Sequence, residues 1–112
     1  MLQYEQITEQ AAVAPQITPD DLPALKEAGF TVVINNRPDH EEPGQPEGAV
    51  IEAAAKAVGL RYYFIPVAGF GPSMEAVDAF KAALDEAQGP VLAYCRSGAR
   101  SASMLALVEG RR

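Results

Sequence analysis

The residues best suited to chemistry lie together near the end of the chain, in the run Cys95-Arg96-Ser97-Gly98-Ala99-Arg100-Ser101. Cys95 is the one cysteine in 112 residues, and it directly follows Val91-Leu92-Ala93-Tyr94, an apolar segment typical of a buried strand. A tight loop between a strand and a helix directs its backbone N–H groups toward a common centre, and the helix adds its positive end. Both effects favour a thiolate over a thiol. The pattern therefore predicts a cysteine nucleophile.

The rest of this run is suited to holding an anion beside Cys95. Arg100 can present a planar pair of N–H donors to an oxyanion, so we expect it to be the second catalytic residue. Gly98 permits a turn that a side chain would obstruct, and the Ser101 hydroxyl could donate to the sulfur. The alternative is a buried cysteine with only a packing role, but arginines beside a core cysteine are costly unless they meet an anion. The expected anion-binding residues are Arg96, Ser97, Gly98, Ala99 and Ser101.

Composition excludes several other kinds of protein. Nine basic against fifteen acidic side chains give a net charge of −6, which argues against a nucleic-acid partner. The apolar runs are too short to span a membrane, and the first residues lack a secretory signal. One cysteine and one histidine cannot make a Cys/His zinc site, and we expect neither a metal nor a cofactor. A lone cysteine also fits a reducing compartment, so we expect a cytoplasmic protein with one domain over residues 1–112.

Strand-like and helix-like segments alternate along the chain. This alternation predicts an α/β fold of three layers, with a mainly parallel sheet between helices. In such sheets ligands bind beyond the carboxyl ends of the strands, which is where Cys95 falls. The expected strands are residues 4–7, 30–34, 61–65 and 91–94, and the expected helices are 18–29, 49–58, 73–88 and 101–108.

Several other residues have two interpretations each. Arg37 and Asp39 follow the second expected strand and either line the rim of the Cys95 site or form a local pair in a proline turn. The acidic pair Glu41-Glu42 is expected to be a solvated loop tip, and His40 a solvated loop residue. Phe70, between two glycines, is either a lip over the site or part of a mobile loop.

Three motifs together resemble a known family. They are Asn35-Asn36-Arg37-Pro38-Asp39, Ile65-Pro66-Val67, and the segment from Gly89 to Ser101. The match, over about residues 16–108, is to the phosphatase-like domain of bacterial β-lactamase hydrolase-like proteins. The resemblance implies the fold of dual-specificity protein tyrosine phosphatases with a Cys-x4-Arg loop similar to that of rhodanese sulfurtransferases. Some relatives are fused to a persulfide dioxygenase, which is therefore an expected partner. Many continue past Arg112, which implies a closing helix that this chain would lack.

The sequence departs from the phosphatase pattern at three places. Phosphatases of that class carry the arginine six residues after the cysteine, where this chain has Ser101, and a histidine where it has Tyr94. Their general acid follows the Ile-Pro strand end, but residues 67–71 here contain no carboxylate. Without an acid, an alkoxide must leave unprotonated, although Asp39 or Glu41 could serve from the other loop.

Sulfur transfer needs no such acid, because sulfite or a thiolate leaves as a stable anion. The leading hypothesis is therefore a sulfurtransferase that carries sulfane sulfur from a small-molecule donor as a Cys95 persulfide. The first alternative is a phosphatase that hydrolyses phosphate esters through a phosphocysteine. The second is a non-catalytic module that binds anions or persulfides.

Overall fold

Five short strands form one sheet in the order β1-β2-β5-β3-β4 in the computed structural model, which describes residues 2–110. Strands β2, β5, β3 and β4 are parallel, and β1 is an antiparallel edge strand against β2. The bounds are β1 Glu5–Gln6, β2 Ala11–Ala14, β3 Val32–Asn35, β4 Arg61–Phe64 and β5 Val91–Tyr94.

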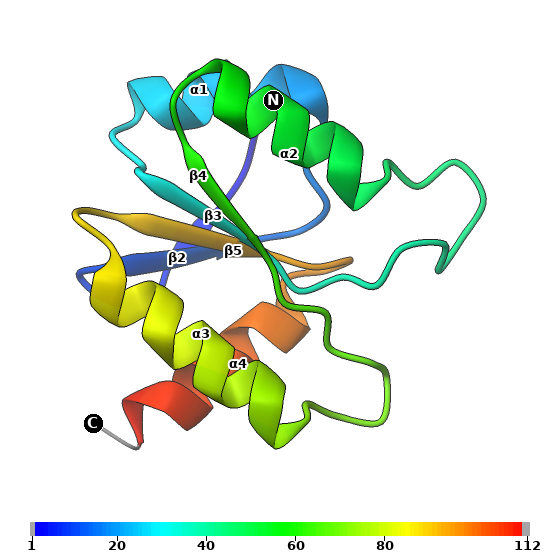
Figure 1. The fold of residues 1–112 in the computed structure, drawn as a ribbon, viewed down its shortest axis with the longest axis vertical. Helices are drawn as coiled ribbons and strands as arrows, with labels where there is room; N and C mark the ends of the chain where they lie inside the picture. The colour runs from blue at the N-terminus through cyan, green and yellow to red at the C-terminus, as the bar shows by residue number, and fades with distance from the viewer. Residues whose placement is uncertain (1, 111–112) are drawn as a thin grey trace.

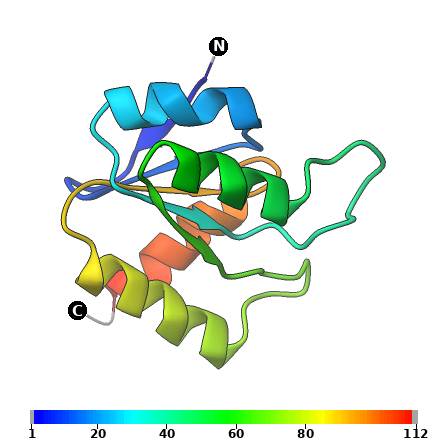
Figure 2. The same ribbon diagram turned by 45° about the horizontal axis from the view of Figure 1, so that its top comes forward.

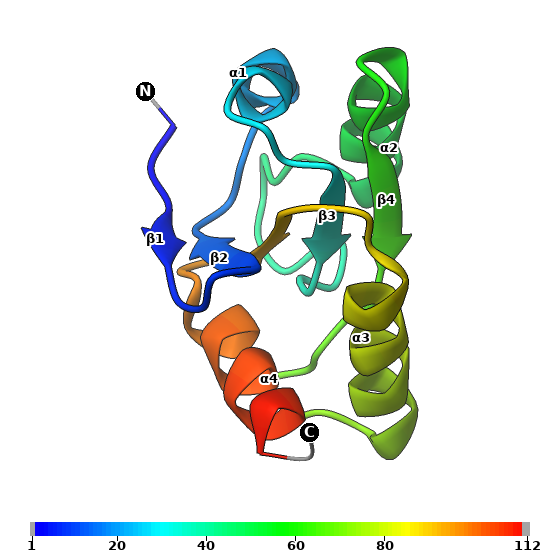
Figure 3. The same cartoon turned by 90° about the vertical axis from the view of Figure 1, so that its left-hand side faces the viewer.

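Helices cover both faces of this sheet (Figures 1 and 2). On one face lie α1 (Leu22–Glu27), preceded by the 3-10 turn η1 (Pro19–Asp21), and α2 (Gly48–Ala57); on the other lie α3 (Met74–Glu86) and α4 (Ala99–Glu109). Figure 3 shows the sheet between the two helical layers. The expected three-layer α/β fold with a mainly parallel sheet is confirmed. No helix among the described residues is long and apolar enough to cross a membrane.

The central strand β5 shows why its sequence is an unbroken apolar run. All four of its residues are buried, and successive side chains point to opposite faces of the sheet. Val91 and Ala93 join the core under α3 and α4, whereas Leu92 and Tyr94 join the core under α1 and α2. Both faces are covered, so neither set of positions is polar.

Local sequence signals place the helix ends as expected. The Thr18 amide donates to the Asp21 carboxylate at 2.8 Å, which forms half of a capping box. Ser73 caps α3 by accepting from the Ala76 amide at 3.0 Å. Gly29 has a φ of +99° just after α1, a conformation that favours glycine.

The structure differs from the sequence-based expectations at four points. The strand β2 was not predicted, because three of its four residues are alanine; its pairing with β5 fixes it instead. Met74 was expected in the core but is 64% exposed at the start of α3. Helix α4 begins at Ala99, two residues earlier than expected. Tyr62 and Tyr63 were expected to be core and surface, but both are half-buried against opposite cores.

Candidate active site

Three parallel strands end at the same level of the sheet. Asn35 at the end of β3 pairs in register with Tyr94 of β5 and with Phe64 of β4. The segments 36–47, 65–72 and 95–98, which follow these strands, therefore leave the sheet at one edge. Cys95 is the first residue beyond β5, as the sequence predicts.

The Cys95 sulfur lies inside the loop between β5 and α4. The Gly98 amide donates to the sulfur at 3.0 Å, and Gly98 reaches this position with a φ of +95°. Burial alone would raise the pKa of the Cys95 thiol, since Cys95 is fully buried. The backbone N–H groups of Ser101, Gly98, Arg100 and Ser97 outweigh burial, and the pKa lies below its ordinary value. The loop therefore stabilises a thiolate with backbone donors, as expected.

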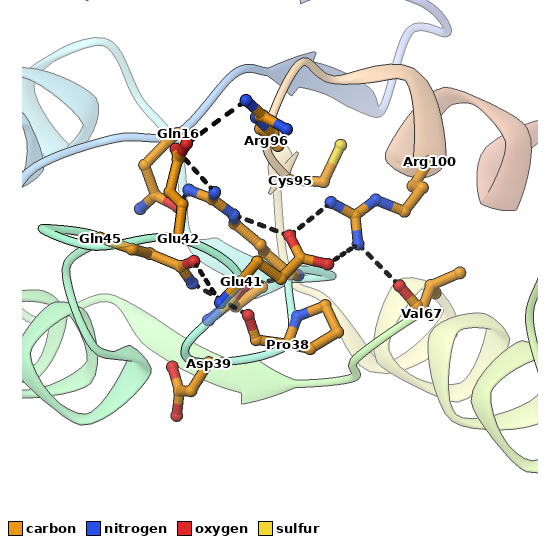
Figure 4. Close-up of polar contacts among 12 residues, drawn as sticks. Gln16, Pro38, Asp39, Glu41, Glu42, Gln45, Val67, Cys95, Arg96 and Arg100 are labelled. Carbon is orange, nitrogen blue, oxygen red and sulfur yellow. Dashed lines mark hydrogen bonds and ion pairs between the residues drawn. The ribbon is translucent and has the colours of Figure 1, made fainter. Parts of the chain in front are cut away.

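The Arg100 side chain is paired with a carboxylate from the other loop. Its two terminal nitrogens donate to the two oxygens of Glu41 at 2.7 and 2.8 Å, and one of them also donates to the Val67 carbonyl at 2.8 Å (Figure 4). Hydrogen bonding to Arg100 is the largest of the effects that lower the pKa of Glu41 to about 2. Glu41 is exposed, as expected of a loop tip, but its carboxylate is paired with Arg100, which the expectation did not include.

Arg37 also contacts Glu41 and is 2% exposed. Its three nitrogens donate to Glu41 at 2.9 Å, to Glu42 at 2.9 Å and to the Gln16 side chain at 3.0 Å. Each nitrogen of the buried guanidinium therefore has a partner, and two of the three partners are carboxylates, which is the condition under which a buried charge is tolerated. Its ion pairs are with Glu41 and Glu42, so the local Arg37–Asp39 pair considered from the sequence is not formed.

Glu42 connects Arg37 to a residue of the cysteine loop. Its second oxygen lies 3.3 Å from Arg96, which is largely exposed. Hydrogen bonding to Arg37 is the main cause that lowers the pKa of Glu42. The ion pairs of the site thus join the guanidinium groups of Arg37, Arg96 and Arg100 to the carboxylates of Glu41 and Glu42.

Ser101 acts differently from its expected side-chain role. Its hydroxyl donates to the Asn36 side-chain oxygen at 2.8 Å, and the Asn36 amide donates to the Ile65 carbonyl at 2.8 Å. Because the Ile65 carbonyl can only accept, it fixes the orientation of Asn36, and the Ser101 proton is used on Asn36. The Ser101 contribution to Cys95 comes from its backbone N–H group.

The remaining candidates lie at different distances from this site. Asp39 accepts from the Gly48 amide at 2.8 Å at the start of α2, and Figure 4 shows its carboxylate directed away from Cys95. His40 is exposed with a φ of 63°. Phe70 is 96% exposed on the segment that follows β4, near a hollow of about 250 Å³ whose lining includes Val67, Arg100 and Met104.

Sequence reasoning considered Glu41 only as a general acid and missed its ion pairs, and it missed the contacts of Gln16, Asn36 and Glu42. Asn36 belongs to a motif that carried the family resemblance, which was the available signal. The two glutamates had no signal of their own, because a pair of acidic residues in a proline-rich loop is most often solvated.

The fold and the cysteine loop define a phosphatase-like protein with the fold of the protein tyrosine phosphatases. The kinase-associated phosphatase superposes with a TM-score of 0.69 at 16% identity, over 88% of this chain and 63% of that chain, which shows the fold. A candidate phosphatase from Neisseria meningitidis has a TM-score of 0.82 at 31% identity, over 90% of this chain and 72% of that chain.

The chain belongs to the family of the phosphatase-like domain of β-lactamase hydrolase-like proteins, whose model matches residues 3–111. The match extends beyond the segment that carried the resemblance. A β-lactamase hydrolase-like protein of Agrobacterium fabrum is 42% identical over 103 residues, which cover 92% of this chain and 24% of that protein. The chain thus spans about a quarter of the length of this curated relative.

Proposed function

We propose that this domain is a cysteine-dependent phosphatase-like hydrolase in which Cys95 attacks the phosphorus of a phosphate monoester. The observation that carries the proposal is the loop itself: the Gly98 amide donates to the sulfur at 3.0 Å, backbone N–H groups of the segment 97–101 lower the pKa of Cys95, and Cys95 in turn helps to raise the pKa of Arg100. This arrangement combines an ionised nucleophile with donors for the charge of a phosphoryl group. The phosphatase-like family and fold support this reaction more than the sulfur transfer favoured by the sequence.

The reaction would proceed in two steps at one sulfur. The Cys95 thiolate forms a bond to phosphorus while the ester P–O bond breaks, and the leaving alcohol oxygen departs with the electron pair and takes a proton from water. Water then attacks the phosphocysteine, the S–P bond breaks, and inorganic phosphate leaves with the thiolate restored. Arg100 and the loop N–H groups hold the phosphoryl oxygens in both steps.

Sulfur transfer is the second candidate, and the lack of a placed acid favours it. Residues 67–71 contain no carboxylate, and Glu41 is ionised, with a pKa of about 2. In this reaction the thiolate takes the outer sulfur of thiosulfate and sulfite leaves without a proton. An acceptor such as cyanide then removes that sulfur from the Cys95 persulfide. A persulfide dioxygenase would be a matching partner, since it consumes persulfides.

One paired assay distinguishes these functions. Hydrolysis of aryl phosphates and thiosulfate:cyanide sulfur transfer are measured on the wild type and on Cys95→Ser, with Glu47→Gln as a variant away from the cysteine loop. We expect hydrolysis that is abolished by Cys95→Ser, with rates that rise steeply as the leaving group becomes more acidic. Sulfur transfer without hydrolysis would overturn the phosphatase in favour of the second candidate. If neither activity is detected, the result would favour a module that binds anions without turnover.

A further inference from the structure

The Arg100 guanidinium already holds an anion that belongs to the chain itself. Glu41 takes both terminal nitrogens of Arg100 in a two-point contact at 2.7 and 2.8 Å, the geometry in which an arginine binds an external oxyanion. Figure 4 shows the Glu41 carboxylate directed at the Arg100 guanidinium, and Glu41 also accepts from Arg37 at 2.9 Å. An anionic ligand that uses Arg100 in the same way must first displace Glu41.

The position of Glu41 is fixed by the surrounding loop. The buried Arg37 donates to the Glu41 oxygen Oε1 at 2.9 Å, and Arg100 donates to the same oxygen. The Glu41 backbone amide donates to the Gln45 side chain at 3.0 Å, and Gln45 in turn donates to the Pro38 carbonyl at 2.9 Å. Because the main chain and the side chain are both held, Glu41 competes for Arg100 with the high effective concentration of an intramolecular ligand.

Glu41 leaves part of the site unused. Among the described residues, the three hydrogen bonds of its carboxylate all come from arginines: one oxygen accepts from Arg37 and Arg100, and the other accepts from Arg100. The Gly98 amide donates to the Cys95 sulfur at 3.0 Å, and within the described residues no backbone N–H group of the cysteine loop donates to the Glu41 carboxylate. An incoming planar carboxylate could only reproduce the contacts of Glu41, whereas a tetrahedral oxyanion has further oxygens for the loop N–H groups.

We propose that Glu41 is a specificity-determining residue that occupies Arg100 until a tetrahedral oxyanion replaces it, and that it excludes planar carboxylates from the site. The inference rests on the anion-binding part of the proposed function. It does not depend on which reaction follows, because phosphate esters and thiosulfate both present tetrahedral oxyanions. A substrate of this domain would then need at least three oxygens on one central atom.

The test measures binding without turnover. Isothermal titration calorimetry with inorganic phosphate and with acetate, in Bis-Tris chloride buffer, is carried out on the wild type, Glu41→Gln and Glu41→Asp. We expect the wild type to bind phosphate and not acetate. Glu41→Gln should bind phosphate about tenfold more tightly and should also bind acetate, because a neutral amide is a weaker ligand of Arg100. Glu41→Asp keeps the charge on a shorter side chain and should lie between the two.

Glu47→Gln is the matched control, because it removes the same charge from the same loop and Glu47 is no ion-pair partner of Arg37, Arg96 or Arg100 within the described chain. Its phosphate affinity should stay within twofold of the wild type. Equal gains in Glu41→Gln and Glu47→Gln would overturn the proposal, as would acetate binding by the wild type. If turnover is absent but this binding pattern holds, the proposed function fails and the role of Glu41 stands. If turnover is present and Glu41→Gln changes neither the phosphate nor the acetate affinity, the proposed function stands and the role of Glu41 fails.

Discussion

Two loops meet at the edge of the sheet, and they are built in different ways. The loop from Cys95 to Gly98 is short, and backbone N–H groups carry its chemistry. The loop from Asn36 to Glu47 is long and rich in proline, and side chains make its contacts with the site. Backbone donors are fixed by loop length and by one glycine, whereas side-chain contacts depend on where a long loop folds back. The first kind of site can be inferred from spacing, and the second cannot.

The largest expected effect tests whether the chemistry belongs to the short loop. Cys95→Ser replaces the thiolate with a hydroxyl that remains protonated, and we expect turnover to fall by about 10³-fold or more. The measurement is the steady-state rate in whichever of the two assays is active. Cys95→Ala should lose as much activity, and circular dichroism should show both variants folded. Retention of a tenth of the activity by Cys95→Ser would mean that the reaction does not use this loop.

A second variant pair tests the long loop through stability. The double substitution Glu41→Ala and Glu42→Ala leaves the buried Arg37 without its carboxylates, and we expect it to lower the free energy of unfolding by about 3 kcal/mol. The single substitution Arg37→Met removes the buried charge itself, and it should lower the free energy of unfolding by less than half as much. Urea unfolding checks both. Equal losses in the two variants would show that the burial of Arg37 carries no penalty that the glutamates relieve.

One glycine in each loop allows a matched comparison. Gly98 has a φ of +95°, and a Cβ there would lie 3.4 Å from the Ala14 carbonyl carbon; Gly44 has a φ of +81°, with nothing within 4 Å of its Cβ position. Alanine should cost about 1 kcal/mol of stability at either position. Only Gly98→Ala should also raise the pKa of Cys95, because the amide that donates to the sulfur must shift. The pH dependence of alkylation of Cys95 measures this, and equal profiles in the two variants would contradict it.

The smallest effect concerns the pH dependence of stability. The pKa of Glu41 is about 2 in the folded protein, below its ordinary value of 4.5, so the unfolded chain binds the proton more readily. The stabilisation from this group is complete above pH 4.5 and is lost as the pH falls toward 2. We expect the melting temperature of the wild type to drop by a few degrees more than that of Glu41→Gln over this range. Parallel melting curves would indicate that the pair with Arg100 adds no stability.

The same contrast explains how much of the molecule could be predicted. The layers, the position of Cys95 at the end of β5 and the caps at Thr18 and Ser73 follow from local patterns. The strand β2 could not be predicted, because alanines take the strand conformation only when β5 is there to pair with them. The contacts of Glu41 and Arg37 with the site join residues whose meeting depends on the path of a twelve-residue loop, from Asn36 to Glu47. No periodic pattern in the sequence indicates where this loop folds back onto the site.

The burial of Ser101 also has a consequence for the spacing between cysteine and arginine. In α4 each residue turns the side-chain direction by about 100°, so an arginine one position later would point to a different side of the helix. That position is occupied by Ser101, which is fully buried against Asn36. The six-residue spacing of the phosphatases therefore cannot be restored here by exchanging Arg100 and Ser101. It would also require the first turn of α4 to rotate about the helix axis. The orientation of α4 about its axis is therefore as necessary to this site as the Cys95 thiol.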